Sequence, residues 1–382
     1  MPSSRTSASV PVATPPSVLP LLSVLTEVVD PRGRRGRRYP LVALVAAGIA
    51  ATLAGARSFA AIAQWLADQE PAVAVALGFD QDRRAPEESV FRRLFARLDP
   101  EMLDALIGAW MWTVTGCVAG RRVIALDGKT VRGARLAGAL APHLVAAFDH
   151  AAGVVVGQLA VAAKTNEIPT VRALLKILDL RGAVVTIDAM HAQDDTAELI
   201  TAGGGDYVVT VKGNRPSLHA ALKALPWKDV PAHSSTEKTR GRRVRRTIKT
   251  TAVPAWITFP GAAQVAQLRR TVTVKGIKTV EVVYVITSVD HATAPPATLA
   301  AWVQGHWSVE NKLHYVRDVA YAEDTSRVRT GHAPRIMATL RNTAISLLHL
   351  TGATNITKAL RHLDRTPGKI IRLLNSSNPT MP

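Results

Sequence analysis

The sequence predicts an α/β protein in which a mixed domain follows a helical region and is interrupted by a β-rich segment. From about residue 21 to 118, apolar residues recur every three or four positions, which is the period of a helix. After residue 121, short apolar runs bounded by Gly, Pro or Asp alternate with amphipathic stretches, whereas residues 226–290 contain strand-like runs without a convincing helix.

The length and the charge of the chain limit its organisation and its partners. A chain of 382 residues, of which 47% are apolar, has enough material for two or three folded units. Lys and Arg number 47 against 29 acidic residues, so the formal charge is +18. An excess of this size indicates a polyanionic partner.

The N-terminal part is expected to consist of a disordered tail and a helical domain. Residues 1–20 have almost no charged or aromatic side chains, and residues 21–118 carry the helical pattern. The apolar stretch 41–56 has 16 residues, fewer than the roughly 20 that cross a bilayer. We therefore expect a buried helix and no membrane partner. The single Cys117 excludes internal disulfides, favours a reducing cytoplasm and is expected in the core.

The mixed domain is expected over residues 119–225 and 291–352. Strands are predicted at 121–128, 143–149, 154–162, 183–188 and 206–212, with helices at 166–180 and 192–202. This β-β-β-α-β-α-β order is found in ribonuclease-H-like domains, although order alone also suits other α/β folds. Residues 226–290 would form a β-rich insertion, and residues 353–382 a basic C-terminal tail.

Two aspartates stand at the ends of predicted strands. Asp127 follows the apolar run VIAL, and Asp188 follows VVTI. Ligands of open α/β sheets gather at the carboxyl ends of strands, so these carboxylates could share a metal ion. Acids are common at strand ends, and the pair alone does not decide the question.

A third acid, Glu310, lies in a charged helical segment. Glu310, His314 and Arg317 stand at positions i, i+4 and i+7, which share one face of an α-helix. The alternative is a solvated polar stripe. Three carboxylates suit Mg²⁺, and two such ions can support in-line phosphoryl displacement. A phosphate-binding loop is excluded, because Val123 stands where its first Gly is required.

Several long motifs resemble the H-repeat-associated, or ISAs-group, insertion-sequence transposases of the DDE superfamily. The motifs are IALDGKTVRGA, KTNEIPTVRALLKILDLRGAVVTIDAMHAQ, GGDYVVTVKGN and WSVENKLHYVRDVAYAEDTSRVRTGHAPRIMATLRN. The resemblance covers nearly everything after residue 20. It implies that Asp127, Asp188 and Glu310 bind two Mg²⁺ ions, for which Mn²⁺ could substitute, and that residues 21–118 match the helical domain associated with this family.

Related transposases that have a β-rich insertion carry a Tyr, an Arg and a Lys or Arg around the final Glu. Arg317 matches the last of these positions, whereas Val303 and His306 occupy the first two. We therefore assign no catalytic role to Val303 or His306, although His306 could still contact a phosphate.

Basic residues near the acids and in the insertion are candidates for DNA contact. The segment from Lys238 to Lys249 holds seven positive charges in twelve residues, and Arg32, Arg34, Arg35, Arg37 and Arg38 form an earlier run. The alternative for the insertion cluster is a charged edge that discourages aggregation. The predicted DNA-contacting residues are Lys129, Arg132, Lys212, Lys238, Arg240, Arg242, Arg243, Arg245, Arg246 and Arg317.

The resemblance implies a bacterial transposase that cleaves and joins DNA, with terminal inverted repeats and target DNA as partners. A homodimer in the synaptic complex and a cytoplasmic location at the nucleoid are expected with it. Two alternatives stay open at this point: a domesticated nuclease that cuts without joining, and a non-catalytic DNA-binding protein derived from a transposon. The inverted repeats are expected to contact the helical N-terminal domain.

Overall fold

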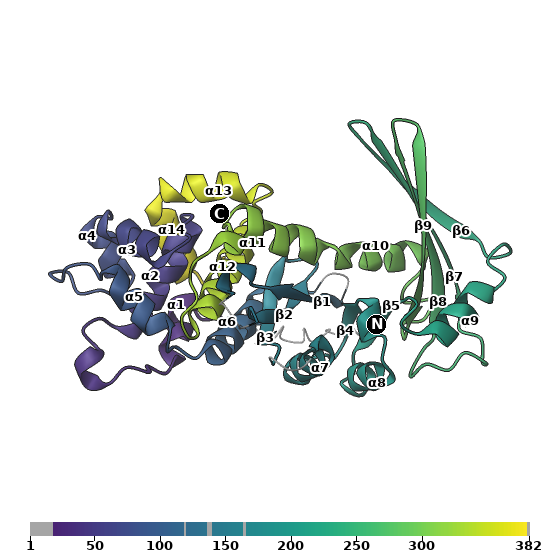
Figure 1. Ribbon diagram of the computed structural model, residues 1–382, viewed down its shortest axis with the longest axis horizontal. Coiled ribbons are helices and arrows are strands. Elements are labelled where there is room, and N and C mark those ends of the chain that lie inside the picture. Colours follow the sequence, from purple (N-terminus) through teal and green to yellow (C-terminus); the bar gives the residue numbers. More distant parts are fainter. Residues whose placement is uncertain (1–17, 118–119, 136–139, 163–165, 380–382) are drawn as a thin grey trace, which may run out of the picture.

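The computed structural model describes residues 18–117, 120–135, 140–162 and 166–379. Its N-terminal part is helical, and the helices lie at the end of the molecule opposite the long β-hairpins (Figure 1). The helices are α1 (Leu21–Val24), α2 (Leu41–Leu53), α3 (Phe59–Ala67), α4 (Pro71–Ala76), α5 (Glu88–Phe95) and α6 (Pro100–Val114). Of the disordered tail predicted for residues 1–20, residues 1–17 lie outside the described residues, and α1 begins directly after Pro20.

A nine-stranded sheet follows, in the order β3-β2-β1-β4-β5-β9-β8-β7-β6. Its first five strands are β1 (Arg122–Thr130), β2 (His143–Asp149), β3 (Val154–Ala160), β4 (Ala183–Ile187) and β5 (Asp206–Val211). The pairs β1–β2 and β2–β3 are antiparallel, whereas β1–β4 and β4–β5 are parallel. This arrangement is that of a ribonuclease-H-like domain, so the predicted fold class is confirmed.

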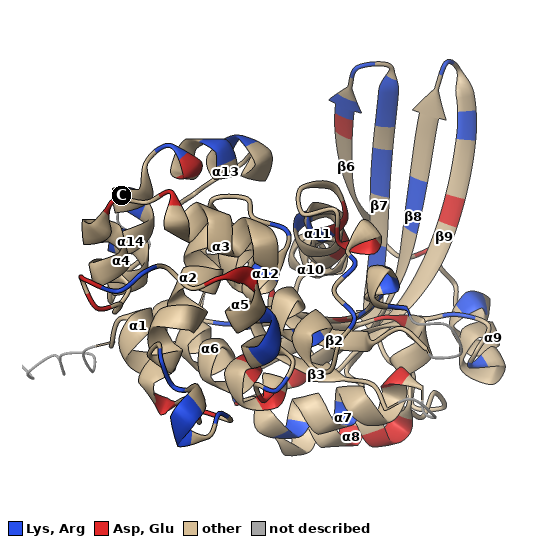
Figure 2. Ribbon diagram, turned by 60° about the vertical axis from the view of Figure 1, so that its left-hand side comes forward, with Lys and Arg blue, Asp and Glu red and all other residues tan. Residues whose placement is uncertain are grey.

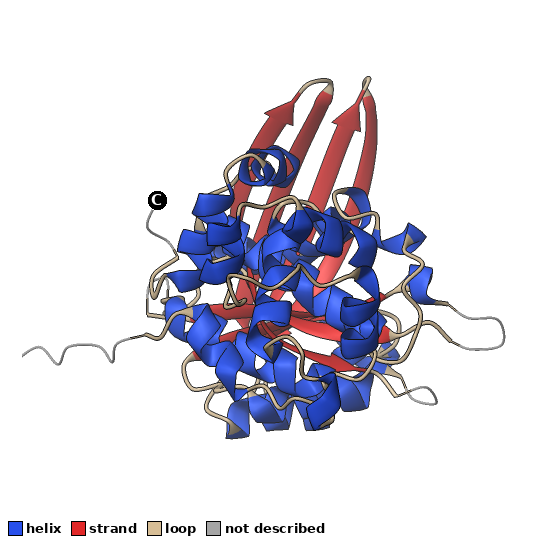
Figure 3. Cartoon of the chain, turned by 90° about the vertical axis from the view of Figure 1, so that its left-hand side faces the viewer, coloured by secondary structure: helices blue, strands red, loops and turns tan. Residues whose placement is uncertain are grey.

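Helices cover both faces of these five strands, and Figure 3 shows the strands between them. On one side lie α7 (Glu167–Ile177) and α8 (Asp194–Ala202), and on the other lie α10 (Pro296–His306), α11 (Tyr315–Val319) and α12 (Ala333–Leu350) (Figure 1). A further helix, α9 (Pro216–Ala224), follows β5. Asn166 caps α7 by accepting a hydrogen bond from the backbone N–H of Ile168.

The β-rich insertion extends the same sheet. It consists of β6 (Ala232–Thr239), β7 (Arg242–Ala252), β8 (Gln264–Val274) and β9 (Ile277–Thr287), and β9 pairs with β5 over Val208–Val211. Their distal halves project from the body of the molecule as two hairpins (Figure 1). The insertion is therefore anchored to the mixed domain by backbone hydrogen bonds.

The N-terminal helices share one hydrophobic core with the mixed domain. Helix α2 is buried along nearly its whole length, as predicted for residues 41–56, and it packs against α12. Helix α6 lies directly on β3, because a Cβ at Gly108 would stand 2.6 Å from the carbonyl oxygen of Val156. In the described residues no helix is long and apolar enough to cross a membrane.

Two sequence-based expectations differ from the structure. Residues 353–382 were expected to form a basic tail, but they contain α13 (Ile356–Asp364) and α14 (Pro367–Asn375). Both helices are amphipathic and bury apolar side chains such as Leu360 and Leu374 in the core. Cys117 was expected in the core, but it is exposed in the loop after α6, because that helix ends at Val114.

Candidate active site

Asp127 and Asp188 lie side by side at one edge of the sheet. Strands β1 and β4 are parallel neighbours, with Leu126 opposite Ile187. The next residue along β1 is Asp127 and the next residue after β4 is Asp188, so the two carboxylates lie close together. Asp188 is more than half exposed, and a surface pocket of about 480 Å³ opens beside it. The parallel pairing thus positions both predicted acids.

The electrostatics of Asp127 show that several carboxylates converge on it. Burial raises the pKa of Asp127 to about 6, the backbone N–H of Gly128 opposes this, and the charges of Glu167, Asp188 and Glu310 raise it further. Gly128 donates to Oδ1 of Asp127 over 2.9 Å. Asp127 therefore lies among like charges that a bound cation would relieve.

Glu310 approaches this site from a distorted part of the helical segment. Residues Glu310–His314 form a π-helical turn between α10 and α11, and the side chain of Glu310 is exposed. The expectation that Glu310, His314 and Arg317 share one face is not met, since Glu310 is exposed whereas the other two are buried. Turns of this kind are frequent at functional sites.

His314 contacts Asp127 directly. Its Nδ1 lies 3.4 Å from Oδ2 of Asp127. Burial lowers the pKa of His314 to about 3, and the nearby Arg317 and Lys129 lower it as well. The imidazole is therefore neutral at neutral pH, so this contact supplies no cation to Asp127.

Glu167 is a fourth acid that the sequence analysis did not single out. Its Oε1 lies 2.6 Å from Nε2 of His143, its Oε2 lies 3.5 Å from Nε2 of His191, and these contacts lower the pKa of Glu167 to about 2. A Cβ at Gly128 would meet the Glu167 carboxylate at 2.5 Å. In the sequence, Glu167 resembled an ordinary first-turn acid of a helix, and only the fold brings it to β1.

The donor set is suited to a hard divalent ion, although it is not closed around one. Asp127, Asp188 and Glu310 offer carboxylate oxygens, which Mg²⁺ prefers, and the charges of the other two add to the effect of burial in raising the pKa of Asp127. In the described parts of the chain, however, no three acid or histidine side chains already form a metal-binding group. Asp127, Asp188 and Glu310 fit Mg²⁺ because their oxygens are the ligands it prefers and because they lie at the same part of the sheet. Waters or phosphate oxygens would complete the coordination of the ion.

A second histidine, His306, lies behind Asp188 at the end of α10. Nδ1 of His306 lies 3.0 Å from Oγ1 of Thr186, a residue of β4. Nε2 of His150 lies at the same distance from that hydroxyl oxygen. Burial lowers the pKa of His306, and the charge of Asp188 opposes this. His306 is therefore held against β4 by a side-chain network.

The predicted DNA-contacting residues near the acids differ in accessibility. Nζ of Lys212 lies 3.6 Å from Oδ1 of Asp188, and its side chain is more than half exposed. Arg132 is largely exposed, with its guanidinium 3.8 Å from Asp324. Lys129 is mostly buried in an ion pair of 2.6 Å with Asp318. Lys212 and Arg132 thus remain available to a ligand, and Lys129 is engaged.

The prediction that Arg317 contacts DNA is wrong for this structure. Its side chain is fully buried, forms an ion pair of 2.8 Å with Glu323, and donates to Asn342. A buried, paired guanidinium cannot reach a phosphate. The spacing from Glu310 suggested the role, but the π-helical turn and the packing of α11 on α12 direct Arg317 into the interior.

The basic residues of the insertion divide between two faces of the hairpins. Arg246 pairs with Glu237 and Arg270 with Glu281, on the face where Arg270 stacks over the ring of Trp307. The opposite face is formed by the intervening residues of the same strands. A hollow of about 680 Å³ lies on it, and none of the residues that line this hollow is acidic. The cations of this open face are Lys228, Arg243, Arg245, Lys249, Arg269 and Lys278.

The register places the remaining predicted residues of the hairpins. Lys238 lies opposite Arg243 and so belongs to the open face, whereas Arg242 lies opposite Val274 on the other face. Arg240 stands in the turn between β6 and β7. Figure 2 shows Lys and Arg along β7 and β8 and acidic residues on β6 and β9. Lys228, Arg269 and Lys278 were not predicted to contact DNA, because they lie outside the dense basic run of residues 238–249.

Comparisons with known proteins agree on the nature of this chain. Residues 119–347 match a family model described as Transposase DDE domain, and residues 22–111 match one described as DDE_Tnp_1-associated. The H repeat-associated putative transposase YhhI of Escherichia coli K12 is 33% identical over 290 residues, which cover 70% of this chain and 75% of that protein.

Two further proteins are similar over long stretches. The Putative transposase YncI of Escherichia coli O157:H7 is 32% identical over 287 residues, covering 70% of this chain and 72% of that protein. Among solved structures, the piggyBac transposase in a synaptic complex with hairpin DNA aligns with 92% of this chain and 76% of that chain. It has 11% identity and a TM-score of 0.40.

Proposed function

The chain belongs to the DDE transposase family, and from this premise we propose that it cleaves DNA at the ends of a bacterial insertion sequence and joins them to target DNA. The observation that carries the proposal is the convergence of Asp188, Glu310 and Glu167 on Asp127, whose charges add to the effect of burial in raising the pKa of that carboxyl to about 6. Such a cluster is unfavourable without a cation and suits Mg²⁺ or Mn²⁺.

In this proposal Asp127, Asp188 and Glu310 hold two metal ions. When bound, the ions supply activation of the attacking oxygen and stabilisation of the leaving oxygen in an in-line displacement. Gly128 orients Asp127 through its N–H, and neutral His314 packs against the other oxygen without competing as a cation. Lys212, beside Asp188, would neutralise a phosphate of the bound strand.

The open face of the hairpins is proposed to bind the phosphate backbone. It concentrates six cations without an acid, whereas on the other face Arg246 and Arg270 are paired with acids. Phosphate contacts position a duplex without determining its sequence. We propose that the element ends are bound by this face and by the helical N-terminal part. Two copies of the chain would form the synaptic complex, on nucleoid DNA in the bacterial cytoplasm.

The decisive test is Asp188→Asn on a plasmid that carries the element and its flanks. With Mg²⁺, the wild type is expected to release a 3′-hydroxyl at the element end, and the variant to lose at least about 10³-fold in rate, since several kcal/mol of metal stabilisation disappear. Asp195→Asn is the matched control, because Asp195 is an exposed aspartate on α8 paired with Arg172.

Two outcomes would contradict the proposal. Cleavage retained by Asp188→Asn would remove Asp188 from the mechanism. Cleavage by the wild type without joined products, when a target plasmid is supplied, would leave a nuclease in place of a transposase. Mobility-shift assays in parallel would verify that Asp188→Asn still binds the element ends.

A further inference from the structure

A pocket rich in arginine lies in the helical N-terminal region, at the end of the molecule opposite the hairpins. It measures about 860 Å³ and is lined by the segment 32–39 and by residues 84–97, which include α5. Four arginines from the first segment and three from the second line it, against one acid, Glu87. The lining therefore carries a formal charge of +6.

Three of these arginines have no partner among the residues that the structure describes. Arg34, Arg35 and Arg97 are exposed, and in the described residues none of their side chains makes a hydrogen bond or an ion pair. The other contacts leave most of the charge uncompensated. Arg84 lies 3.9 Å from Glu87, and Arg93 donates to Ser89. Mutual repulsion in this pocket is therefore relieved only by an external anion or by solvent.

The basic segment is fixed by a scaffold of hydrogen bonds. Arg32 is buried, pairs with Asp30 at 2.8 Å and donates to the carbonyl of Tyr39. The hydroxyl of Tyr39 donates to the carbonyl of Arg84 over 2.9 Å, and Arg83 donates to the carbonyl of Arg38. These bonds hold the two arginine-bearing segments beside each other, which a merely solubilising surface does not require.

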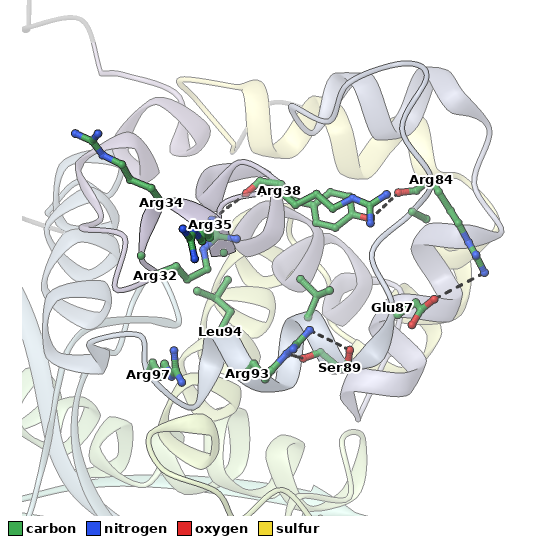
Figure 4. Close-up of a pocket in the computed structure, with 15 residues that line it drawn as sticks. Arg32, Arg34, Arg35, Arg38, Arg84, Glu87, Ser89, Arg93, Leu94 and Arg97 are labelled. Atoms are coloured by element: carbon green, nitrogen blue, oxygen red, sulfur yellow. Dashed lines mark hydrogen bonds and ion pairs between the residues drawn. The ribbon is translucent and has the colours of Figure 1, made fainter.

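Helix α5 supplies the opposite wall. Phe91, Leu94 and Phe95 are buried, so the apolar face of α5 is committed to the core. Figure 4 shows Arg34, Arg35 and Arg38 along one side of the pocket and Arg93 and Arg97 along the other. Two facing rows of guanidinium groups suit a linear polyanion, because successive phosphates can contact both rows.

We propose that this arginine pocket binds the phosphate backbone of duplex DNA at a site separate from the acids and from the hairpins. The identity of the duplex as element DNA rests on the proposed function, whereas the binding itself does not. Guanidinium groups form bidentate contacts with phosphate oxygens and remain charged at every relevant pH. The pocket would extend the DNA path to the far end of the molecule.

The test compares two triple variants that remove the same charge. One is Arg34→Gln, Arg35→Gln and Arg97→Gln in the pocket, and the other is Arg361→Gln, Arg365→Gln and Arg372→Gln at exposed positions of the α13–α14 region. Each substitution leaves the core untouched, and thermal unfolding verifies that both variants fold. Affinity for a blunt 30-base-pair duplex is measured by fluorescence anisotropy in EDTA, so that cleavage plays no part.

The pocket variant is expected to lose about 10- to 100-fold in affinity near 0.1 M salt, and the slope of log Kd against log salt to fall by about 2.7, since each phosphate contact contributes roughly 0.9. The control variant is expected to change much less. Equal losses in both variants would overturn the proposal, because bulk charge would then explain the binding.

A second arm separates DNA from a small phosphorylated ligand. Calorimetry with pyrophosphate is run on the wild type and on the pocket variant. Pyrophosphate binding that the variant loses, together with unchanged duplex affinity, would overturn the assignment to DNA. Anisotropy in EDTA does not depend on the metal-binding acids, so failure of the Asp188→Asn test would not change the measured affinity of the arginine pocket for DNA. Conversely, failure of the pocket variants to lose affinity would not change the outcome of the Asp188→Asn test.

Discussion

The carboxylates beside β1 and β4 keep oxygens open to a ligand, whereas the carboxylate of Glu323 is enclosed by the protein. Glu323 is fully buried and lies 2.8 Å from both Arg317 and Arg341. Asp127 has a neutral His314 at 3.4 Å and three acids near it. The charge of Glu323 is fully paired by two guanidinium groups, whereas among the described residues Asp127 has no cation in direct contact.

The pKa values follow this difference. Burial raises the pKa of Glu323, but Arg317 and Arg341 outweigh it and leave that pKa below its ordinary value. Burial likewise raises the pKa of Asp127, and the surrounding acids add to the shift. Internal charge pairing thus marks a structural role for Glu323, while uncompensated charge at Asp127 marks a site for an external ligand.

The largest effect is expected for Glu323→Gln. The substitution leaves two buried guanidinium groups without their counter-ion, so the free energy of unfolding should fall by about 3–5 kcal/mol. Urea unfolding followed by circular dichroism measures it. Glu281→Gln is the control, because Glu281 pairs with Arg270 at 3.6 Å on an exposed hairpin and should change stability by less than about 1 kcal/mol. Similar losses in both would show that the buried centre is not special.

Asp104 is an intermediate case, a buried carboxylate without a direct ion pair. Burial raises its pKa to about 7, and hydrogen bonds from Thr339 and Gln158 oppose the shift. Its folded pKa lies above the unfolded value of 3.8. The proton it binds therefore stabilises the fold below about pH 4, and this contribution is lost as the pH rises through 7.

Between pH 5 and pH 8 this group should remove about 2–3 kcal/mol of stability. Asp104→Asn should abolish that part of the pH dependence and be more stable than the wild type at pH 8. The hydroxyl of Thr339 can turn to the carbonyl of Arg335 and accept from the new amide. Urea midpoints at pH 5 and pH 8 measure the effect, and an unchanged slope with pH in the variant would contradict it.

The same comparison explains which features the sequence could predict. Asp127 and Asp188 each follow a buried apolar run, so local apolar patterning was enough to find them, and the parallel pairing of β1 and β4 brings them together. Strand β6 was not predicted, because it is an exposed edge strand of polar residues without alternation. Helices α13 and α14 were missed for a related reason, since their basic residues concealed an apolar stripe.

Side chains that act through long-range contacts could not be inferred. Glu167 reaches β1 only because α7 packs against β2 and β3. The burial of Arg317 depends on the π-helical turn before it, and nothing in the spacing of residues 310 to 317 indicates that turn. Similarly, the arginine pocket requires Tyr39 and Arg84, which are 45 residues apart, to meet. Tertiary packing decided these cases.

The smallest effect on stability is expected for Glu310→Gln, thirteen residues before Glu323 in the chain. Glu310 is exposed, so the substitution should change the free energy of unfolding by no more than about 0.5 kcal/mol. It should nevertheless abolish cleavage, because it removes a proposed metal ligand and one of the charges that act on Asp127. The two glutamates would then have distinct roles. Glu323→Gln would lower the free energy of unfolding, and Glu310→Gln would lower only the rate of cleavage. A stability loss above about 2 kcal/mol in Glu310→Gln, or cleavage that persists in it, would break the distinction between paired and open carboxylates.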